Sequence, residues 1–209
     1  MGRYIDSKCK LCRREGMKLF LKGQRCFTDK CAVSRRDYPP GVHAQKRTKV
    51  TDYGVRMREK QKLKRIYGVW ERQFKLCFRE AERMKGNTGE NLMALLERRL
   101  DNVVLASGFA LSRNHARQLV NHGHFTVNAK WVDVCSFTVR PGDVVAPHAK
   151  KEKIRKSVAE ALEVNKSQPV PAWLEVNRDN LSARVVAMPR RDDVPHPIQE
   201  QLIIELCSK

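Results

Sequence analysis

Four cysteines near the start of the chain constrain its fold more than any other feature. Cys9 and Cys12 form one close pair, and Cys26 and Cys31 form a second pair after a gap of thirteen residues. Zinc needs thiolate ligands that converge to about 2.3 Å from the ion, and two close pairs joined by a loop reach that geometry at little ordering cost. The spacing therefore predicts one structural Zn²⁺ ion held by all four cysteines, with no open position for catalysis.

Two other interpretations of these cysteines stay open. An iron–sulfur cluster uses the same four ligands, and free or redox-active thiols need no metal. The surrounding cations favour a centre with several thiolates, because they offset its negative charge. These cations are Lys8, Lys10, Arg13, Arg14, Arg25 and Lys30.

Positive charge is concentrated in the same part of the chain. The 209 residues carry a net charge of +19, from 42 Lys and Arg against 23 Asp and Glu. Residues 1–65 hold 20 of the basic and 6 of the acidic residues, which leaves 22 against 17 for the rest. Such a basic end is typical of proteins that neutralise phosphates and release counterions. Nucleic acid is therefore the expected partner, and an anionic membrane is the weaker alternative.

The composition predicts a folded, cytosolic protein. Hydrophobic residues make up 41% and charged residues 31%, which allows modest cores under a charged surface. No apolar run approaches the roughly 18 residues of a transmembrane helix, and the polar start lacks a secretory signal. Cys77, Cys135 and Cys207 stand alone in apolar settings, so we interpret them as small core residues in a reducing compartment.

Helical patterns follow a basic arm in the first half of the chain. The arm, organised by metal, contains an extended or turning segment at 38–41, where two prolines exclude a helix interior. We expect a helix over 52–67 with a very basic outer face and a stop at Gly68, then a helix over 70–84 with an apolar stripe. Another amphipathic helix is expected from residue 92 to about 108, with a polar face that carries Arg98, Arg99 and Asn102.

A short helix and several short strands are expected next. Ser112 can cap a helix over 113–122, and FTVN and WVDV form a hairpin around residues 128–130. VVA is a further short strand, and the basic run 150–156 leads into a weak helix. WLEV and ARVVAM alternate like strands, whereas IQEQLIIEL fits either a short helix or a strand.

One face of the 113–122 helix has the chemistry to contact RNA. Arg113, Arg117 and Asn121 recur at i, i+4 and i+8, opposite an apolar face. Guanidinium groups suit phosphates, and amide or imidazole groups suit sugars and base edges, as shape-based RNA recognition requires. Because an ordinary solvated helix face carries the same residue types, the pattern alone does not decide the function.

Residues 111–145, LSRNHARQLVNHGHFTVNAKWVDVCSFTVRPGDVV, resemble the small RNA-binding module named after ribosomal protein four of the small subunit. The resemblance extends to MGRYIDSKCKLCRREGMKLFLKGQRCF, RRDYPPGVHAQKR, DYGVRMREKQKLKRIYGVWERQF, LLERRLDNVV and the final EQLIIELCSK. These segments are similar to the family of bacterial-type small-subunit ribosomal protein four, of the zinc-bearing, four-cysteine type. The similarity covers nearly the whole chain, and 150–196 is its least diagnostic part.

This resemblance implies an α+β fold with three parts. They are a basic zinc-knuckle amino-terminal arm over 1–48, a mostly helical first domain over 49–97 that 197–209 completes, and a small mixed α/β RNA-binding module with a carboxyl-terminal extension over 98–196. The module has a helix pair, a β-hairpin and short strands. Ala129 departs from the glycine that is common after asparagine in this hairpin, so we expect a rearranged or slightly strained turn.

The resemblance also implies a role and partners. The implied protein is a structural component of the small ribosomal subunit, located in the cytoplasm on the ribosome. It is a primary binder of the 5′-domain junction of small-subunit ribosomal RNA, nucleates assembly and contributes to translational accuracy. Ribosomal proteins five and three are implied as neighbours, with messenger RNA near the entry channel, and neither a membrane nor DNA is expected as a partner.

The expected RNA contacts are basic, amide and imidazole side chains in four groups. They are Arg3, Arg13, Arg14, Lys22, Arg25, Arg35 and Arg36 around the knuckles; His43, Gln45, Lys46 and Arg47 in the arm; Tyr53, Arg56, Lys60, Lys62, Lys64 and Arg65 on the 52–67 helix; and Arg113, Arg117, Gln118, Asn121, His122, His124 and Asn128 in the module.

Three alternative functions share some of these sequence features. The same module occurs in modifying enzymes and synthetases, but the sequence shows no Gly-rich phosphate loop and no persuasive nucleophile and base, so no enzyme is expected. A zinc-finger DNA regulator is disfavoured because the cysteine pairs do not lead into a helix-in-groove motif. An RNA-binding regulator or ribosome-assembly factor with the same module, including one that represses its own messenger, stays open.

Overall fold

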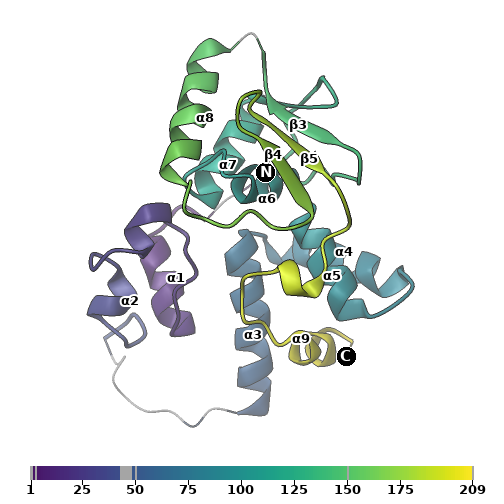
Figure 1. Ribbon diagram of the computed structural model, residues 1–209. Helices are drawn as coiled ribbons and strands as arrows, with labels where there is room; N and C mark the ends of the chain where they lie inside the picture. Colours follow the sequence, from purple (N-terminus) through teal and green to yellow (C-terminus); the bar gives the residue numbers. More distant parts are fainter. Residues whose placement is uncertain (1, 3, 43–48, 50, 150, 209) are drawn as a thin grey trace. The chain divides into compact units, whose positions relative to one another are not determined.

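The structure is a computed structural model that describes residues 2, 4–42, 49, 51–149 and 151–208. The chain divides into two compact units (Figure 1). Unit 1 comprises Met1–Leu92 together with His196–Lys209, and unit 2 comprises Met93–Pro195. None of the helices in the described part of the chain combines the length and apolar character needed to cross a membrane.

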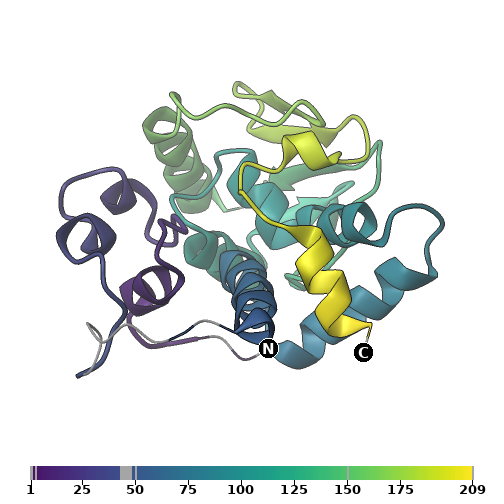
Figure 2. The same cartoon turned by 90° about the horizontal axis from the view of Figure 1, so that it is seen from below.

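Unit 1 is built from helices. Its elements are α1 (Lys8–Glu15), the 3₁₀ helix η1 (Gly23–Cys26), α2 (Ala32–Arg35), α3 (Asp52–Tyr67), α4 (Glu71–Arg83), the first part of α5 (Thr88–Glu97), and α9 (Glu200–Cys207). The sequence left the state of the last segment open between helix and strand, and it is the helix α9. Figure 2 shows α9 beside α3, against which it packs.

The bounds of α3 follow from local chemistry and confirm the expected helix. The Thr51 hydroxyl accepts a hydrogen bond from the Gly54 N–H at 3.2 Å, which satisfies one free donor of the first turn. Gly68 ends the helix in the left-handed conformation at φ 62°, which favours glycine. α4 likewise confirms the second expected helix, and it buries Phe74 and Phe78.

Unit 2 is a five-stranded antiparallel sheet with helices packed on it. Its elements are the end of α5, α6 (Leu100–Ala106), α7 (Arg113–Asn121), β1 (Phe125–Val127), β2 (Lys130–Val132), β3 (Val144–Pro147), α8 (Glu152–Val164), β4 (Leu174–Asn177), β5 (Ser182–Val185) and the 3₁₀ helix η2 (Arg191–Asp193). The strand order is β2-β1-β3-β5-β4. One face of the sheet lies against α6, α7 and α8 (Figure 1). The core that they share buries Phe109, Phe125 and Trp173. The α+β class with a mostly helical first part is therefore confirmed.

The hairpin keeps a tight two-residue turn despite its alanine. Val127 pairs with Lys130, and the two residues between them, Asn128 and Ala129, have φ of 50° and 64°. Two successive positive φ values define the turn that matches the twist of a hairpin. The turn is therefore not rearranged, and Ala129 occupies a conformation that glycine adopts at lower cost.

The expectation of one helix from residue 92 to 108 is wrong, because the chain is extended at Arg99 between α5 and α6. Arg99 has ψ 137° and forms an isolated antiparallel bridge with Thr138. The Leu100 N–H donates to the Phe137 carbonyl, and the Val139 N–H donates to the Arg98 carbonyl. Pairing with this distant segment replaces the helical hydrogen bonds at the break.

The expected polar face of that helix is also wrong, because two of its residues are buried. The Arg99 guanidinium binds both carboxylate oxygens of Asp101 at 3.1 and 2.9 Å. The Asn102 amide donates to the Glu97 carbonyl and carboxylate at 2.9 and 2.6 Å. Since buried polar groups are tolerated where they are bonded, these pairs hold the break together from inside.

The three isolated cysteines differ in burial. Cys135 lies in the core of unit 2, as expected. Cys77 and Cys207 are only partly buried, so their interpretation as core residues is wrong. Cys77 shares the stripe of Phe74 and Phe78 but lies at its edge, because the stripe is narrower than the periodicity suggests.

Candidate nucleic-acid interface

The four amino-terminal cysteines line one small pocket in unit 1. Cys9 and Cys12 lie on α1, Cys26 ends η1, and Cys31 directly precedes α2. Cys9 is half-buried and the other three are buried. The pocket also contains basic and aliphatic side chains, which are Lys8, Leu21, Lys22, Arg25, Ala32 and Val33. Short helical elements therefore carry the two cysteine pairs.

The donor set of this pocket fits zinc in its chemistry. Burial raises the pKa of Cys12 and of Cys26, and the neighbouring thiols add to the effect. Burial acts in the same direction at Cys31, but hydrogen bonds from the Val33 and Ser34 backbone outweigh it and lower the pKa of that thiol. Across the described ranges no three His, Cys, Asp or Glu side chains are already grouped as a metal cluster. A bound ion would have to draw these thiols together and displace their protons.

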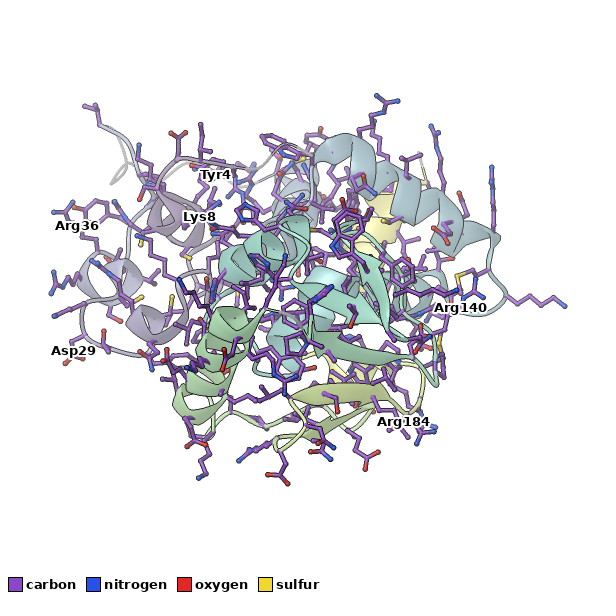
Figure 3. The ribbon with its side chains drawn as sticks, turned by 90° about the horizontal axis from the view of Figure 1, so that it is seen from above. Tyr4, Lys8, Asp29, Arg36, Arg140 and Arg184 are labelled. Carbon is purple, nitrogen blue, oxygen red and sulfur yellow. The ribbon has the colours of Figure 1, made fainter. Side chains whose placement is uncertain are left out.

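We call residues 8–36 the knuckle, and this segment carries several exposed cations. Arg36 points outward from the end of α2 (Figure 3). The exposed members of the set expected to contact RNA are Arg14, Lys22, Arg25, Arg35 and Arg36. An array of solvated guanidinium and ammonium groups can neutralise several phosphates of one RNA backbone.

Arg13 is only partly exposed, and its guanidinium group is bound within unit 1. Its Nε donates to the Tyr38 carbonyl at 3.0 Å, and its Nη2 donates to the Pro39 carbonyl at 3.2 Å. The guanidinium also lies 4.9 Å from the centroid of the Tyr38 ring. Arg13 thus fixes the proline-containing segment to α1, and its contact with RNA stays a prediction.

The expected basic outer face of α3 is wrong for Lys60 and Lys64, which are buried. Both ammonium groups bind Glu71, at 2.9 and 2.6 Å. The other ion pairs of α3 join Arg56 to Glu205, Lys62 to Glu59, and Arg58 and Arg65 to Glu15. Tyr53 is 61% exposed near the start of the helix. The sequence pattern predicted a solvated face because most of these carboxylates come from other helices; only Glu59 lies on α3 itself.

Glu15 is a site residue that the sequence analysis missed. Its side chain is only 1% exposed and pairs with Arg58 at 3.4 Å and with Arg65. Burial raises the pKa of Glu15, although both guanidinium groups oppose that rise. These two ion pairs join α1 to α3 and so connect the knuckle to the longer helices of unit 1. An isolated acidic residue in a strongly basic segment was the available signal.

In unit 2 the exposed polar residues gather at the end of α7. Gln118, Asn121 and His122 are exposed, and the ring of His122 meets the ring of half-buried His124 at a centroid distance of 5.8 Å. Burial, Lys151 and His122 all lower the pKa of His124. The imidazole of His124 is therefore neutral at neutral pH. Its Nδ1 lies 3.0 Å from Lys151 Nζ and accepts from that ammonium group, so the ring can offer its Nε2–H as a donor.

The expected exposed face of α7 is wrong for Arg117, which is only 6% exposed. Arg113 is half-buried and donates to the Asn102 side-chain oxygen. Asn121 remains at the surface, where its oxygen accepts from the Cys135 thiol at 2.8 Å. The Cys135 thiol also donates to the Arg117 carbonyl at 3.3 Å, so a segment that is distant in the sequence packs against α7 at this position.

Asn128 has a structural task in the hairpin. Its amide donates to the Asp143 carboxylate at 2.7 Å, and its oxygen accepts from the Val144 N–H at 2.9 Å. These bonds hold the positive-φ turn against the start of β3, and RNA contact by Asn128 stays a prediction. The remaining expected contacts lie outside the described residues; they are Arg3, His43, Gln45, Lys46 and Arg47.

Comparisons with known proteins match the whole chain. The family model for the ribosomal protein S4/S9 N-terminal domain matches residues 3–97, and the S4 domain model matches residues 98–145. The small ribosomal subunit protein uS4 of Thermoanaerobacter sp. (strain X514) is 58% identical over 209 residues, which is all of both chains. The uS4 proteins of Pelobacter propionicus and Geobacter sulfurreducens are 57% and 55% identical over the same full lengths.

Proposed function

Because this chain belongs to the uS4 family of small ribosomal subunit proteins, we propose that it binds the 5′ domain of small-subunit ribosomal RNA early and nucleates assembly of the subunit. Its general role follows from the family, since it is a structural, RNA-binding component of the small subunit on the cytoplasmic ribosome. This family of structural ribosomal proteins is not a class of enzymes.

The observation that carries the proposal is the chemistry of the exposed residues in each unit. The knuckle in unit 1 exposes five cations of the predicted set, and the end of α7 in unit 2 exposes amide and imidazole groups. Phosphate contacts position an RNA-binding protein, whereas amide and imidazole groups read sugars and base edges. A protein with both kinds of surface is suited to a junction where several RNA helices meet.

Zinc belongs to the same proposal. Cys9, Cys12, Cys26 and Cys31 would hold one structural ion and fix the three short elements that carry them. The exposed cations of the knuckle lie on, between or directly after these elements, so the ion would set their spacing. Four thiolates would carry negative charge, which Lys8, Lys22 and Arg25 around the pocket offset.

The finer partners follow from the family resemblance. We propose ribosomal proteins five and three as neighbours and a position near the messenger entry channel, with an influence on decoding accuracy. Repression of its own messenger would use the same exposed groups on a second RNA. The knuckle and the end of α7 are the surfaces on which these contacts would compete.

Reconstitution on isolated 5′-domain RNA tests the proposal. Hydroxyl-radical footprinting should show protection centred on the helix junction when the zinc-loaded protein is added before any other ribosomal protein. A variant that replaces Arg14, Arg25 and Arg36 with Gln should lose most of this protection while keeping its fold, because these side chains are exposed. Protection that appears only after another ribosomal protein has bound would overturn the role as a primary binder.

A further inference from the structure

Trp131 is a large aromatic side chain that the RNA-binding residues considered above do not include. It lies in β2 and is 59% exposed. It pairs across the hairpin with Thr126, between the buried Phe125 and Val127, so it points to the outer face of the sheet. An exposed indole forgoes the free energy that burial would provide, and exposed apolar surface of this kind often marks a binding site.

The indole ring is held in place on the protein surface. Its Nε1 donates to the Gly123 carbonyl at 3.2 Å. A Cβ atom at Gly123 would overlap the ring, so the indole lies directly against the backbone of this glycine. Gly123 has φ 61°, a conformation that also favours glycine. The ring is thus positioned before any ligand arrives, which lowers the entropic cost of binding to it.

A cation shares the anchor of this ring. Lys151 Nζ donates to the same Gly123 carbonyl at 2.9 Å and to the His122 carbonyl at 3.3 Å. It also lies 3.0 Å from His124 Nδ1, which accepts from the ammonium group. Trp131 and Lys151 therefore meet at one oxygen, directly after α7. His122 and His124 are the residues on either side of Gly123, and their rings contact each other. An aromatic surface beside a fixed ammonium group matches the pairing of a base with its phosphate.

We propose that Trp131 is a stacking platform for one unpaired nucleobase of RNA, with the positive charge of Lys151 attracting the adjoining phosphate. The proposal rests on the RNA-binding function proposed above and adds a residue and a ligand chemistry to it. Aromatic side chains bind splayed-out bases of single-stranded loops and bulges in this way, with little dependence on sequence.

Fluorescence of the full chain tests stacking directly. Trp70→Phe removes the other exposed tryptophan and leaves Trp131 with Trp173, which is 2% exposed. A short single-stranded oligoadenylate should quench the emission of this variant, whereas an abasic strand of equal length and charge should not. Adding Trp131→Phe should abolish the quenching. Equal quenching by both strands would mean charge alone and would overturn the proposal.

Affinity for 5′-domain RNA provides the second readout. Trp131→Ala should weaken binding roughly tenfold, the loss expected for one stacked base, while Trp131→Phe should retain most of the affinity. Trp70→Ala is the matched control, because Trp70 is 51% exposed and its indole also donates to a backbone carbonyl, that of Gly2. It should change affinity less than about twofold. Equal losses for the two alanine variants would refute a specific role of Trp131.

The two proposals fail in different ways. If the wild-type protein does not prefer 5′-domain RNA but its Trp131 is quenched only by the base-bearing strand, the stacking site stands and the assembly role falls. If the preference for 5′-domain RNA is strong and Trp131→Ala binds as tightly as wild type, the assembly role stands and the stacking site falls.

Discussion

Replacing Arg99 should destabilise unit 2 more than any surface change. The Arg99 and Asp101 side chains are each 2% exposed and form a bidentate pair at the break between α5 and α6. Arg99→Met would leave the Asp101 carboxylate buried without its partner. Breaking a buried pair in this way costs about 3–5 kcal/mol of unfolding free energy. Urea unfolding, followed by tryptophan fluorescence to which buried Trp173 contributes, should show a loss of that size.

Two further variants make this measurement decisive. Glu163→Gln removes an ion pair of the same unit whose side chains are 72% and 65% exposed, and it should change stability by less than about 1 kcal/mol. Combining Arg99→Met with Asp101→Leu removes both charges and should recover much of the loss. If Arg99→Met and Glu163→Gln had equal effects, the break between the helices would not depend on the buried pair.

Three other predictions concern unit 1. Chelation of zinc, Cys9→Ser or Cys26→Ser should increase protease cleavage within the knuckle while the unfolding transition of unit 2 stays unchanged, because each unit has its own core; loss of both together would contradict this. Burial raises the pKa of Glu71, but hydrogen bonds from Lys64 and Lys60 outweigh burial and hold this pKa below its ordinary 4.5. Glu71→Gln should therefore be less stable than wild type at pH 7, and the difference should close as pH falls through the folded pKa. Replacing the exposed Arg36 with Gln should lower the slope of RNA affinity against salt by about one unit, whereas replacing the buried Lys64 with Gln should mainly lower the free energy of unfolding. A main effect on stability for Arg36→Gln and on the salt slope for Lys64→Gln would refute the assignment of exposed and internal cations.

Local sequence chemistry predicted the elements whose limits are local. Thr51 and Gly68 begin and end α3 as expected, and Ser112 caps α7 through the His115 N–H. The hairpin was also predicted, because its alternating strands flank Asn128. In each case the decisive contacts lie within a few residues.

Contacts between distant segments explain what the sequence pattern did not predict. The bridge from Arg99 to Thr138 interrupts a helical periodicity that is continuous in the sequence. Glu71 binds lysines that a single-helix pattern places on a solvated face. Trp131 was recognisable as a strand residue, but its exposure depends on the register with Thr126 and on its contact with Gly123. Cation count therefore does not predict which of the cations are exposed.

The role as a primary binder is best tested by the salt dependence of binding to the 5′-domain junction, measured beside an unrelated structured RNA of equal length. The ratio of the two affinities reports specificity, whereas the slope reports phosphate neutralisation. A primary binder of the junction should show a large ratio that persists near physiological salt. Equal affinities that collapse together as salt rises would show nonspecific attraction to polyanions and contradict a primary role in small-subunit assembly.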